Sequence, residues 1–477
     1  TIQGATGEWP DALIPKKDEY VGELRNAFPF SVGAGRNQPI WIEIYIPVTA
    51  AAGVYSGSAT VTASGQNPVV VPIQLTVWNF TLPSTATLKS AYSIDYHLIT
   101  LGHQIGKYDP EKKGHLDLVT LYTKANLLHR LTNDYLPGPQ TLPGKWAQFD
   151  STFGPFLDGT ASLPGGKLSG AKETSYRMSV WSHETDVPFL KEVALHTKSK
   201  GWFDRVFEYT SDEPKTAGDW KTIRVRATAL HQADPKLRAL VTTSYQSASK
   251  NGVASLIDLF VPTLRFMDNK PAPSPRSEVP GGNDTIGNQR SRYGPEVWWY
   301  QACGSHGCGI IGGGPEDRAG YHTGWPAVMI DLPAMFNRIM QWMTFKYHIQ
   351  GELYYDMVYA FGSGDPWTTQ YYYGGNGDGT LYYPGRPDQI GGKSQIPIES
   401  IRLKLLREGM EDYEYLALLK GLGEEAFAQQ QAARLVTNTY TWSKDPALLY
   451  EAREKVALQI LSHLNPAAAP PNPTPAR

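Results

Sequence analysis

The stretch Arg205-Val-Phe-Glu-Tyr-Thr-Ser-Asp-Glu-Pro214 decides how the chain is interpreted. Its apolar and β-branched residues predict a buried strand, and Pro214, which cannot donate to a ladder, predicts the end of that strand. Two adjacent carboxylates, Asp212 and Glu213, stand just before the proline. Parallel α/β barrels hold their active sites at the carboxyl ends of their strands. We therefore place the candidate chemistry at these two residues.

On both sides of this stretch, short apolar segments alternate with helix-length amphipathic segments from Leu88 onward, as in βα units around a parallel sheet. We expect strands over residues 89–96, 133–135, 176–181, 203–209, 237–243, 257–262, 297–302 and 351–359. We expect helices over 117–131, 187–200, 216–232, 333–347 and 398–419, with Thr216 as a cap. About eight strands favour an α/β fold with a (β/α)8 TIM-like barrel. The polar, Gly-rich stretch 137–174 is interpreted as an insertion over one face of that barrel.

The part before the barrel has a different pattern. Ile40, Ile42 and Ile44 alternate with polar or aromatic residues, and further short alternating segments follow up to residue 80. This pattern predicts a small antiparallel β-sandwich, either a packing module or a carbohydrate-binding one. The expected domains are a β-sandwich (1–84), the catalytic barrel (85–395), a C-terminal helical segment packed on the barrel (396–465) and a flexible Pro/Ala-rich tail (466–477).

Length and composition bound the class of protein. A chain of 477 residues predicts two or three domains, and a net charge of −2 gives no reason to expect nucleic acid or an anionic membrane surface as a partner. Aromatic residues make up 12% of the chain, and such rings fill cores and also stack on sugars. No apolar run of about 18 residues is present, so membrane insertion is not expected. The oligomeric state stays open.

Export is the expected fate of the chain. Residues 1–10 lack the features of a signal peptide, and a start at Thr1 is interpreted as a mature or trimmed form. Few cysteines, many tyrosines and a Pro-rich tail favour a secreted, periplasmic or cell-surface protein. Cys303 and Cys308 form a disulfide or remain as two thiols, and a zinc site there would need ligands from elsewhere. No metal or cofactor is expected.

The adjacency of the two carboxylates limits the reaction. Retaining glycosidases hold their two carboxyls about 5–5.5 Å apart and inverting ones about 6.5–9.5 Å apart, on opposite sides of the scissile bond. Neighbours in sequence suit substrate assistance better, because the sugar's 2-acetamido oxygen then attacks and the carboxylates act from one side. In the alternative interpretation, Asp212 caps the following turn and Glu213 is solvated.

The chain resembles glycoside hydrolase family 123 and the related domain of unknown function called DUF4091, whose members carry a strand that ends in Asp-Glu-Pro. The matching stretches are residues 38–47, 53–57, 211–214, 297–300, 351–355, 376–385 and 400–415. The resemblance implies a β-sandwich followed by a (β/α)8 barrel, and substrate-assisted β-N-acetylgalactosaminidase activity. It assigns Glu213 as general acid/base and Asp212 as the residue that orients the acetamide.

Further residues at strand ends are candidates for substrate binding, with packing or structural ion pairs as the alternative. They are Asp95, His97, Tyr245, Trp298, Tyr300, Tyr355, Asp356 and Trp367. Trp298 and Tyr300 alternate with Trp299, so that one set faces the barrel interior. The charged residues from Arg402 to Glu414 are interpreted as a structural helix face with internal ion pairs.

We therefore expect a retaining glycosidase that acts on the β-linked N-acetylhexosaminides of a glycan or glycoconjugate, with β-GalNAc as the expected sugar. A glycosidase for another hexoside or for a furanoside is the first alternative. A non-catalytic glycan-binding protein is the second, although such a protein has no chemical reason to keep both carboxylates.

Overall fold

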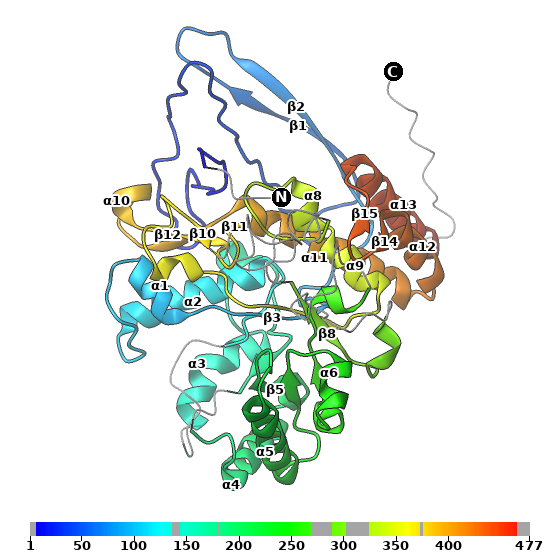
Figure 1. Ribbon diagram of the computed structural model, residues 1–477. Coiled ribbons are helices and arrows are strands. Elements are labelled where there is room, and N and C mark those ends of the chain that lie inside the picture. Colours follow the sequence, from blue (N-terminus) through cyan, green and yellow to red (C-terminus); the bar gives the residue numbers. More distant parts are fainter. Residues whose placement is uncertain are drawn as a thin grey trace.

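The computed structural model describes residues 6–135, 144, 146–178, 182–268, 289–301, 324–372 and 375–464. The chain is a mixed α/β protein in which parallel strands lie in the middle of the molecule and helices surround them (Figure 1). The strands of the parallel sheets are β3 (Lys89–Tyr92), β4 (Tyr176–Arg177), β5 (Val206–Ser211), β6 (Ala239–Val241), β7 (Leu259–Phe260), β8 (Trp298–Tyr300) and β9 (Gly351–Tyr354).

The parallel strands pair in the orders β4-β5-β6-β7 and β3-β9-β8. A parallel bridge from Phe260 to Val297 joins the two sheets on one side. On the other side, Asn133 bridges to Tyr92, and the backbone N–H of Arg177 donates to the carbonyl of Asp134 at 2.8 Å. Each parallel strand is therefore linked to a neighbour on both sides.

One buried cluster collects apolar side chains from six of these strands. Its members are Ala91, Phe207, Leu240, Leu259, Val261, Trp298, Tyr300 and Leu353. Trp299, between two members of this cluster, packs outward and donates to Thr344 of α9 at 3.0 Å. The alternation predicted for this strand is confirmed, because successive side chains of a strand point to opposite faces.

The helices are α1 (Tyr96–Gly102), α2 (Lys113–Leu128), α3 (Trp146–Asp158), α4 (Val187–Ser199), α5 (Ala217–Ala233), α6 (Tyr245–Lys250), α8 (Ala334–Arg338), α9 (Met340–Lys346), α10 (Pro387–Ile390), α11 (Ile401–Gly421), α12 (Glu425–Leu435) and α13 (Pro446–Leu464). Helix α5 follows the central strand β5 and begins where expected. Thr216 accepts from the backbone N–H of Asp219, and the Asp219 side chain accepts in return, which forms a capping box.

Residues 137–174 are interpreted from the sequence as an insertion over one face of the barrel, but helix α3 lies within them. Phe149, Phe153 and Phe156 point from this helix into the core formed with α4 and β4. Their spacing of three and four residues is helical, but Gly154 and Pro155 conceal it, since both residues are poor helix formers. This part of the chain contributes to the core, and residues 136–143 lie outside the described structure.

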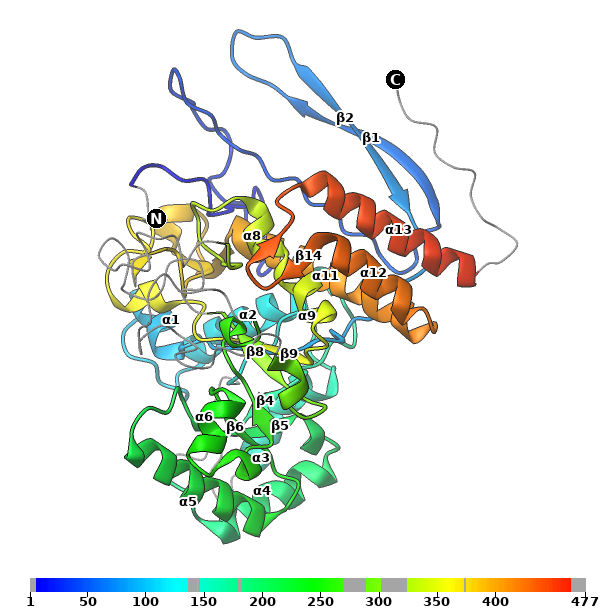
Figure 2. The same ribbon diagram turned by 45° about the vertical axis from the view of Figure 1, so that its right-hand side comes forward.

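The N-terminal part differs from the predicted sandwich. Its two strands, β1 (Gly53–Val61) and β2 (Val69–Val77), form one antiparallel hairpin that projects from the molecule (Figures 1 and 2). The neighbours Val54 and Tyr55 point to opposite faces, and both are exposed, as is the non-strand segment 40–46. Residues 6–84 therefore do not form a two-layer sandwich, because the alternating apolar residues have no second layer to pack against.

Part of the same N-terminal region packs against residues near position 400. The backbone N–H of Leu13 donates to Glu399 at 2.9 Å, and that of Ile401 donates to Asp11 at 2.8 Å. Glu399 ends β13 (Ile396–Glu399), which pairs with β12 (Tyr382–Gly385) across the expected domain boundary at residue 395. Two short hairpins lie nearby in sequence, β10 (Tyr371–Tyr372) with β11 (Gly375–Asn376) and β14 (Val436–Asn438) with β15 (Thr441–Trp442).

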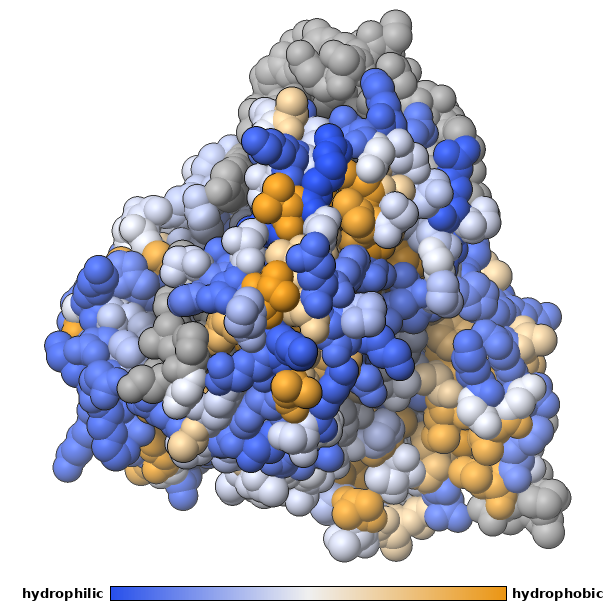
Figure 3. Space-filling model, turned by 90° about the horizontal axis from the view of Figure 1, so that it is seen from below, coloured by the Kyte–Doolittle hydropathy of each residue, from blue (hydrophilic) through white to orange (hydrophobic). Residues whose placement is uncertain are grey.

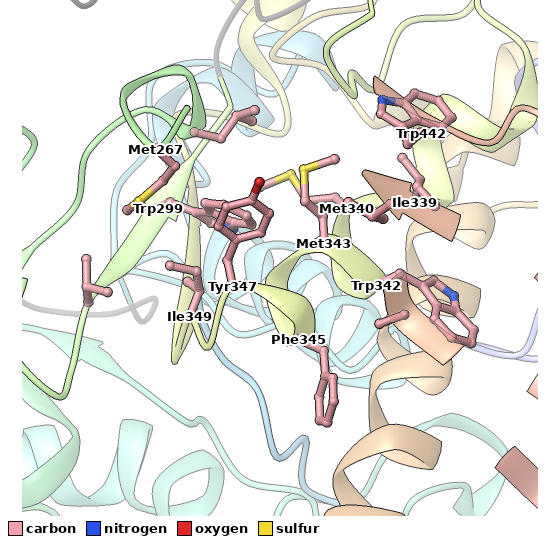
Figure 4. Close-up of a cluster of buried hydrophobic side chains, with 14 of the residues drawn as sticks. Met267, Trp299, Ile339, Met340, Trp342, Met343, Phe345, Tyr347, Ile349 and Trp442 are labelled. Atoms are coloured by element: carbon pink, nitrogen blue, oxygen red, sulfur yellow. The ribbon is translucent and has the colours of Figure 1, made fainter. Parts of the chain in front are cut away.

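The C-terminal helices pack on α8 and α9 through a large apolar core. Figure 4 shows Trp299, Tyr347 and Met267 on one side of α9, and Trp342, Phe345 and Trp442 on the other. The helix predicted over 333–347 is interrupted at Ile339, where α8 ends and α9 begins. Seen from below, the surface is mainly hydrophilic, with hydrophobic residues gathered at one edge (Figure 3). No helix of the described residues is long and apolar enough to cross a membrane.

The burial and contacts of Glu399 predict that the protein loses unfolding free energy in acid. This residue is buried, but Lys404 at 2.5 Å and the Tyr20 hydroxyl at 2.5 Å outweigh the effect of burial and lower the pKa of Glu399 to about 2. A carboxylate with a depressed pKa stabilises the fold fully above its unfolded value and loses that contribution as the pH falls towards 2. We expect roughly 3 kcal/mol of the unfolding free energy to be lost in this window.

Urea unfolding of the wild-type protein and of Glu399→Gln between pH 6 and about pH 2 measures this contribution. The variant is expected to be less stable at pH 6 and to show a shallower loss on acidification. Equal slopes in the two proteins would contradict the role of Glu399.

Candidate active site

The two carboxylates lie just beyond the end of β5. The strand ends at Ser211, and Glu213 has a φ of 39°, in the left-handed region that non-glycine residues rarely occupy. The hydroxyl of Thr242, which follows β6, accepts from the backbone N–H of Glu213 at 2.7 Å. The same hydroxyl donates to Oδ1 of Asp212 at 2.8 Å. One hydroxyl thus binds the side chain of Asp212 and the backbone of Glu213, just beyond the strand end.

Asp212 is held by two hydroxyl groups. Besides Thr242, the hydroxyl of Tyr209 donates to Oδ1 of Asp212 at 2.8 Å. Burial and the charge of Asp212 raise the pKa of Tyr209 well above its ordinary value, so this phenol remains a donor. Because both donors stand on the same oxygen, the Asp212 carboxylate has a defined orientation.

Glu213 is held by an interior tyrosine and faces solvent. The hydroxyl of Tyr300 donates to Oε1 of Glu213 at 2.6 Å, and Nζ of Lys215 lies 3.3 Å from Oε2. Burial and the neighbouring Glu213 raise the pKa of Tyr300 well above its ordinary value. The Glu213 side chain is 46% exposed, so it is accessible to a substrate. In the alternative interpretation, Asp212 only caps a turn and Glu213 is only solvated. The hydrogen bonds from Tyr209 and Thr242 to Asp212, and from Tyr300 to Glu213, go beyond that interpretation.

Two of these contacts were not anticipated from the sequence. Thr242 and Tyr209 were not among the candidates, although Tyr209 shares the interior side of β5 with Phe207. Tyr300 is a candidate for substrate binding from the sequence, and in the structure its hydroxyl binds Glu213. The available signal was strand alternation, which places Tyr209 and Tyr300 on the same interior as the carboxylates.

A polar wall formed by Asp134, Arg177 and Asp356 adjoins the carboxylate pair. The Arg177 guanidinium lies between the rings of Tyr135 and Tyr209, 4.5 and 4.6 Å from their centroids. It is 3.7 Å from Asp134, which also accepts a 2.6 Å hydrogen bond from the hydroxyl of Ser93. Because Tyr209 also binds Asp212, this one tyrosine contacts both the wall, at Arg177, and the carboxylate pair.

The two carboxylates of this wall are buried and strongly perturbed. Burial raises the pKa of Asp134 against the opposing charge of Arg177. Burial also raises the pKa of Asp356 well above its ordinary value, and the nearby Asp95 and Asp134 raise it further. Buried carboxyl groups at the ends of parallel strands are candidates for ligand contacts. Asp356 was predicted as such a contact, whereas Asp134 was not.

The other predicted substrate residues have structural contacts. Asp95 caps α1 by accepting from the backbone of His97 at 2.7 Å, and the His97 ring accepts from Tyr108 at 3.4 Å. Trp298 is fully buried against Phe207, so it belongs to the core and not to a sugar-binding surface.

The remaining candidates are aromatic residues. Tyr245 packs against Phe260 and Tyr293, with centroids 5.8 and 6.2 Å away. Tyr355 packs beside Tyr354, and Trp367 lines a separate cavity. Their contacts with a substrate stay predictions.

The Cys303–Cys308 stretch lies outside the described residues, and so does Trp181. Among the residues that the structure describes, no group of three His, Cys, Asp or Glu side chains is placed to hold a metal ion.

Comparison with known proteins identifies the family of the chain. Residues 181–419, half of the chain and including both carboxylates, match the family model of the glycoside hydrolase 123 catalytic domain. A solved family 123 glycoside hydrolase from Clostridium perfringens, studied for the hydrolysis of glycolipid glycans, has a similar fold. The TM-score is 0.55 at 16% identity, over 87% of this chain and 77% of that one. No curated protein matches the chain. The chain belongs to glycoside hydrolase family 123 and is a glycoside hydrolase.

Proposed function

We propose that the protein is a retaining glycosidase that cleaves β-linked N-acetylhexosaminides, with β-GalNAc as the preferred sugar, by substrate assistance. The observation that carries this proposal is the link through Thr242, which binds Asp212 and the backbone of Glu213 with one hydroxyl. Adjacent residues that are fixed by one hydroxyl just beyond a strand end are expected to act from the same side of a sugar. They do not suit the two opposite faces that an enzymic nucleophile and a separate acid need.

The proposed reaction assigns each carboxylate one task. Glu213 protonates the glycosidic oxygen while the acetamide oxygen of the same sugar attacks the anomeric carbon, which breaks the C1–O bond and forms an oxazolinium ion. Asp212 accepts the acetamide N–H and stabilises the positive charge that develops there. Glu213, now ionised, takes a proton from water as the water opens the oxazolinium ring, so the product keeps the β configuration.

A substrate panel tests the specificity. We expect hydrolysis of p-nitrophenyl N-acetyl-β-galactosaminide, less of the gluco epimer, and little of 2-hydroxy glycosides or furanosides. A thiazoline mimic of the oxazolinium ion is expected to inhibit. Full activity on a 2-hydroxy glycoside without thiazoline inhibition would instead support the alternative of a glycosidase with another specificity.

Thr242 is expected to position both carboxylates. Replacing it with valine keeps the shape but removes both hydrogen bonds, and we expect kcat/KM to fall roughly 10- to 100-fold. The matched control is Thr243→Val, which makes the same change one residue along. Similar activity of the two variants would contradict this role for Thr242.

Asp356 is expected to bind a sugar hydroxyl. Because an unionised or amide side chain fits its buried site, Asp356→Asn is expected to leave the unfolding free energy unchanged or slightly higher, while kcat/KM falls about tenfold or more. Thermal unfolding and kinetics of the same preparation check both expectations. A parallel loss of stability and activity would indicate a structural role.

The ring of parallel pairings supports a further proposal about the fold. With the segment at Asn133 counted as the second strand, the strands form eight positions that follow the chain order. We propose that residues 85–395 form a (β/α)8 barrel, with the carboxylates at the carboxyl end of the fourth strand. Residues 396–465 would then be a helical segment packed on this barrel.

We also propose that the protein acts outside the cytoplasm, as a secreted, periplasmic or cell-surface enzyme. Its expected substrates, the glycans of glycoconjugates, support this location. Fractionation of the source cells tests it, and activity confined to the cytoplasmic fraction would contradict it.

A further inference from the structure

A cavity of about 320 Å³ lies outside the contacts of the two carboxylates. Its lining includes Trp9, Trp367, Gln370, Tyr371, Asn376 and Tyr383. The cavity therefore lies between the segment that carries Trp9 and residues of β10, β11 and β12. The described residues that line the cavity carry no charge, and its size is that of a small-ligand site. Aromatic rings with amide groups and no charge suit a neutral ligand that has an apolar face and hydroxyl groups.

The aromatic residues of the cavity are partly fixed and partly exposed. The indole N–H of Trp367 donates to the carbonyl of Pro384 at 3.0 Å, and the ring packs 5.0 Å from that of Tyr383. Tyr371 is 46% exposed, although it is a large aromatic residue. A held indole beside an accessible phenol ring is an arrangement that stacks on a sugar.

A single buried arginine holds the segments around the cavity together. Arg402 of α11 binds both carboxylate oxygens of Asp11 at 3.0 and 2.8 Å. It also donates to the carbonyls of Val328 and Gly377 at 2.7 Å and to Oε1 of Gln370 at 3.0 Å. The expectation of ion pairs internal to this helix is wrong for Arg402, whose partners lie on three distant segments. Arg402 therefore fixes Gln370, which lines the cavity, relative to Asp11 and helix α11.

The side-chain amide of Gln370, which lines the cavity, has an N–H donor without a partner in the described structure. The side chain is 6% exposed, and Arg402 fixes its amide by binding Oε1. In the described structure, Nε2 of Gln370 has no hydrogen-bond partner. A buried N–H without an acceptor is unfavourable, so this group indicates a ligand oxygen that would accept from it after a small adjustment.

A series of aromatic rings connects the cavity with the end of β9. Tyr372, next to Tyr371, lies 5.5 Å from Tyr359, and Tyr359 lies 6.3 Å from Tyr355. Tyr355 directly precedes Asp356 of the polar wall. The rings thus lead from Tyr372, the chain neighbour of a cavity residue, to the residue before Asp356.

We propose that this cavity binds a neutral sugar unit of the substrate glycan other than the one that is cleaved. Trp367 and Tyr371 stack on the sugar, Nε2 of Gln370 donates to one of its oxygens, and Arg402 is a positioning residue. The inference rests on the proposed glycosidase function, since it names a second subsite for the same substrate.

Two variants test the cavity. Tyr371→Ala removes the exposed ring, and Gln370→Glu keeps an acceptor for Arg402 while it removes the unpaired donor. The control is Tyr55→Ala, a tyrosine of the hairpin with nearly the same exposure, 45%. The substrates are a neutral trisaccharide that ends in β-GalNAc and p-nitrophenyl N-acetyl-β-galactosaminide. We expect the kcat/KM of both cavity variants to fall at least tenfold more on the trisaccharide than on the nitrophenyl glycoside. The control is expected to keep its kcat/KM on both substrates.

Equal losses on both substrates, or no loss on either, would overturn the proposal, and the thermal midpoint of each variant shows whether it folds. Calorimetry separates this inference from the proposed function. The trisaccharide is titrated into Glu213→Gln protein with and without each cavity substitution. Weaker binding in the cavity variants supports the subsite even if no β-GalNAc glycoside is cleaved, and absence of binding to the parent protein overturns it.

Discussion

Glu213→Gln is expected to lower kcat about 10²- to 10⁴-fold on substrates whose leaving group needs a proton. Glutamine keeps an oxygen that accepts from Tyr300, so the side chain remains in place, but its amide neither gives nor takes a proton. The loss therefore reports the acid/base task and not the position of the side chain. Steady-state hydrolysis of phenyl N-acetyl-β-galactosaminide, whose phenolate is a poor leaving group without a proton, measures it.

The dependence on the leaving group distinguishes this role from a general loss of structure. With a 2,4-dinitrophenyl glycoside, which needs little acid assistance, the variant is expected to retain much more of the first step. Glu111→Gln, at an exposed glutamate, is the control. A Glu213→Gln enzyme that keeps a tenth or more of kcat, or loses the same factor with both leaving groups, would contradict the assignment.

Asp212→Asn is expected to lower kcat by a factor on the order of 10²–10³, the size seen when a group that stabilises a developing charge is removed. Tyr209 and Thr242 both donate to Oδ1 of Asp212, so an asparagine bound in the same way presents an NH2 group at the position of Oδ2. That group donates where the acetamide N–H needs an acceptor, and it carries no charge to stabilise the oxazolinium ion.

The matched control for this change is Tyr209→Phe, which keeps the carboxylate and removes one of its two donors. It is expected to cost roughly tenfold, clearly less than Asp212→Asn. If the two variants lost the same activity, Asp212 would act mainly by holding the local structure.

Local patterns predicted the central part of the molecule well. The strand before the two carboxylates, the cap at Thr216 and the alternation of Trp299 with Trp298 and Tyr300 are all confirmed by the structure. Each depends on residues close together in the chain, for which propensity and periodicity are direct physical signals. Membership of glycoside hydrolase family 123 is also confirmed.

The contacts that complete the site depend on residues far apart in sequence. Thr242 reaches Asp212 only because β6 pairs with β5, and Tyr300 reaches Glu213 across the interior from β8. The positive φ of Glu213 is likewise stabilised by Thr242 and not by any local sequence preference. Such contacts follow from the tertiary arrangement, which single-sequence patterns do not determine.

Two of the wrong predictions from sequence patterns have identifiable reasons. Alternation at residues 40–46 indicates a half-buried strand only if a second layer is present, and residues 6–84 supply none. The helical spacing of Phe149, Phe153 and Phe156 was obscured by the Gly-Pro pair beside them. In both cases the local pattern, strand alternation or helical spacing, could be interpreted correctly only with knowledge of the residues that pack against it.

The most direct test of substrate assistance is the rate of hydrolysis across nitrophenyl β-galactosaminides that carry N-acetyl, N-fluoroacetyl, N-difluoroacetyl and N-trifluoroacetyl groups. Fluorine withdraws electrons from the amide oxygen and weakens it as a nucleophile. If that oxygen attacks the anomeric carbon while Asp212 and Glu213 act from one side, kcat/KM falls steeply with each fluorine. A flat series would show that the acetamide does not react, and it would contradict the proposed roles of both carboxylates.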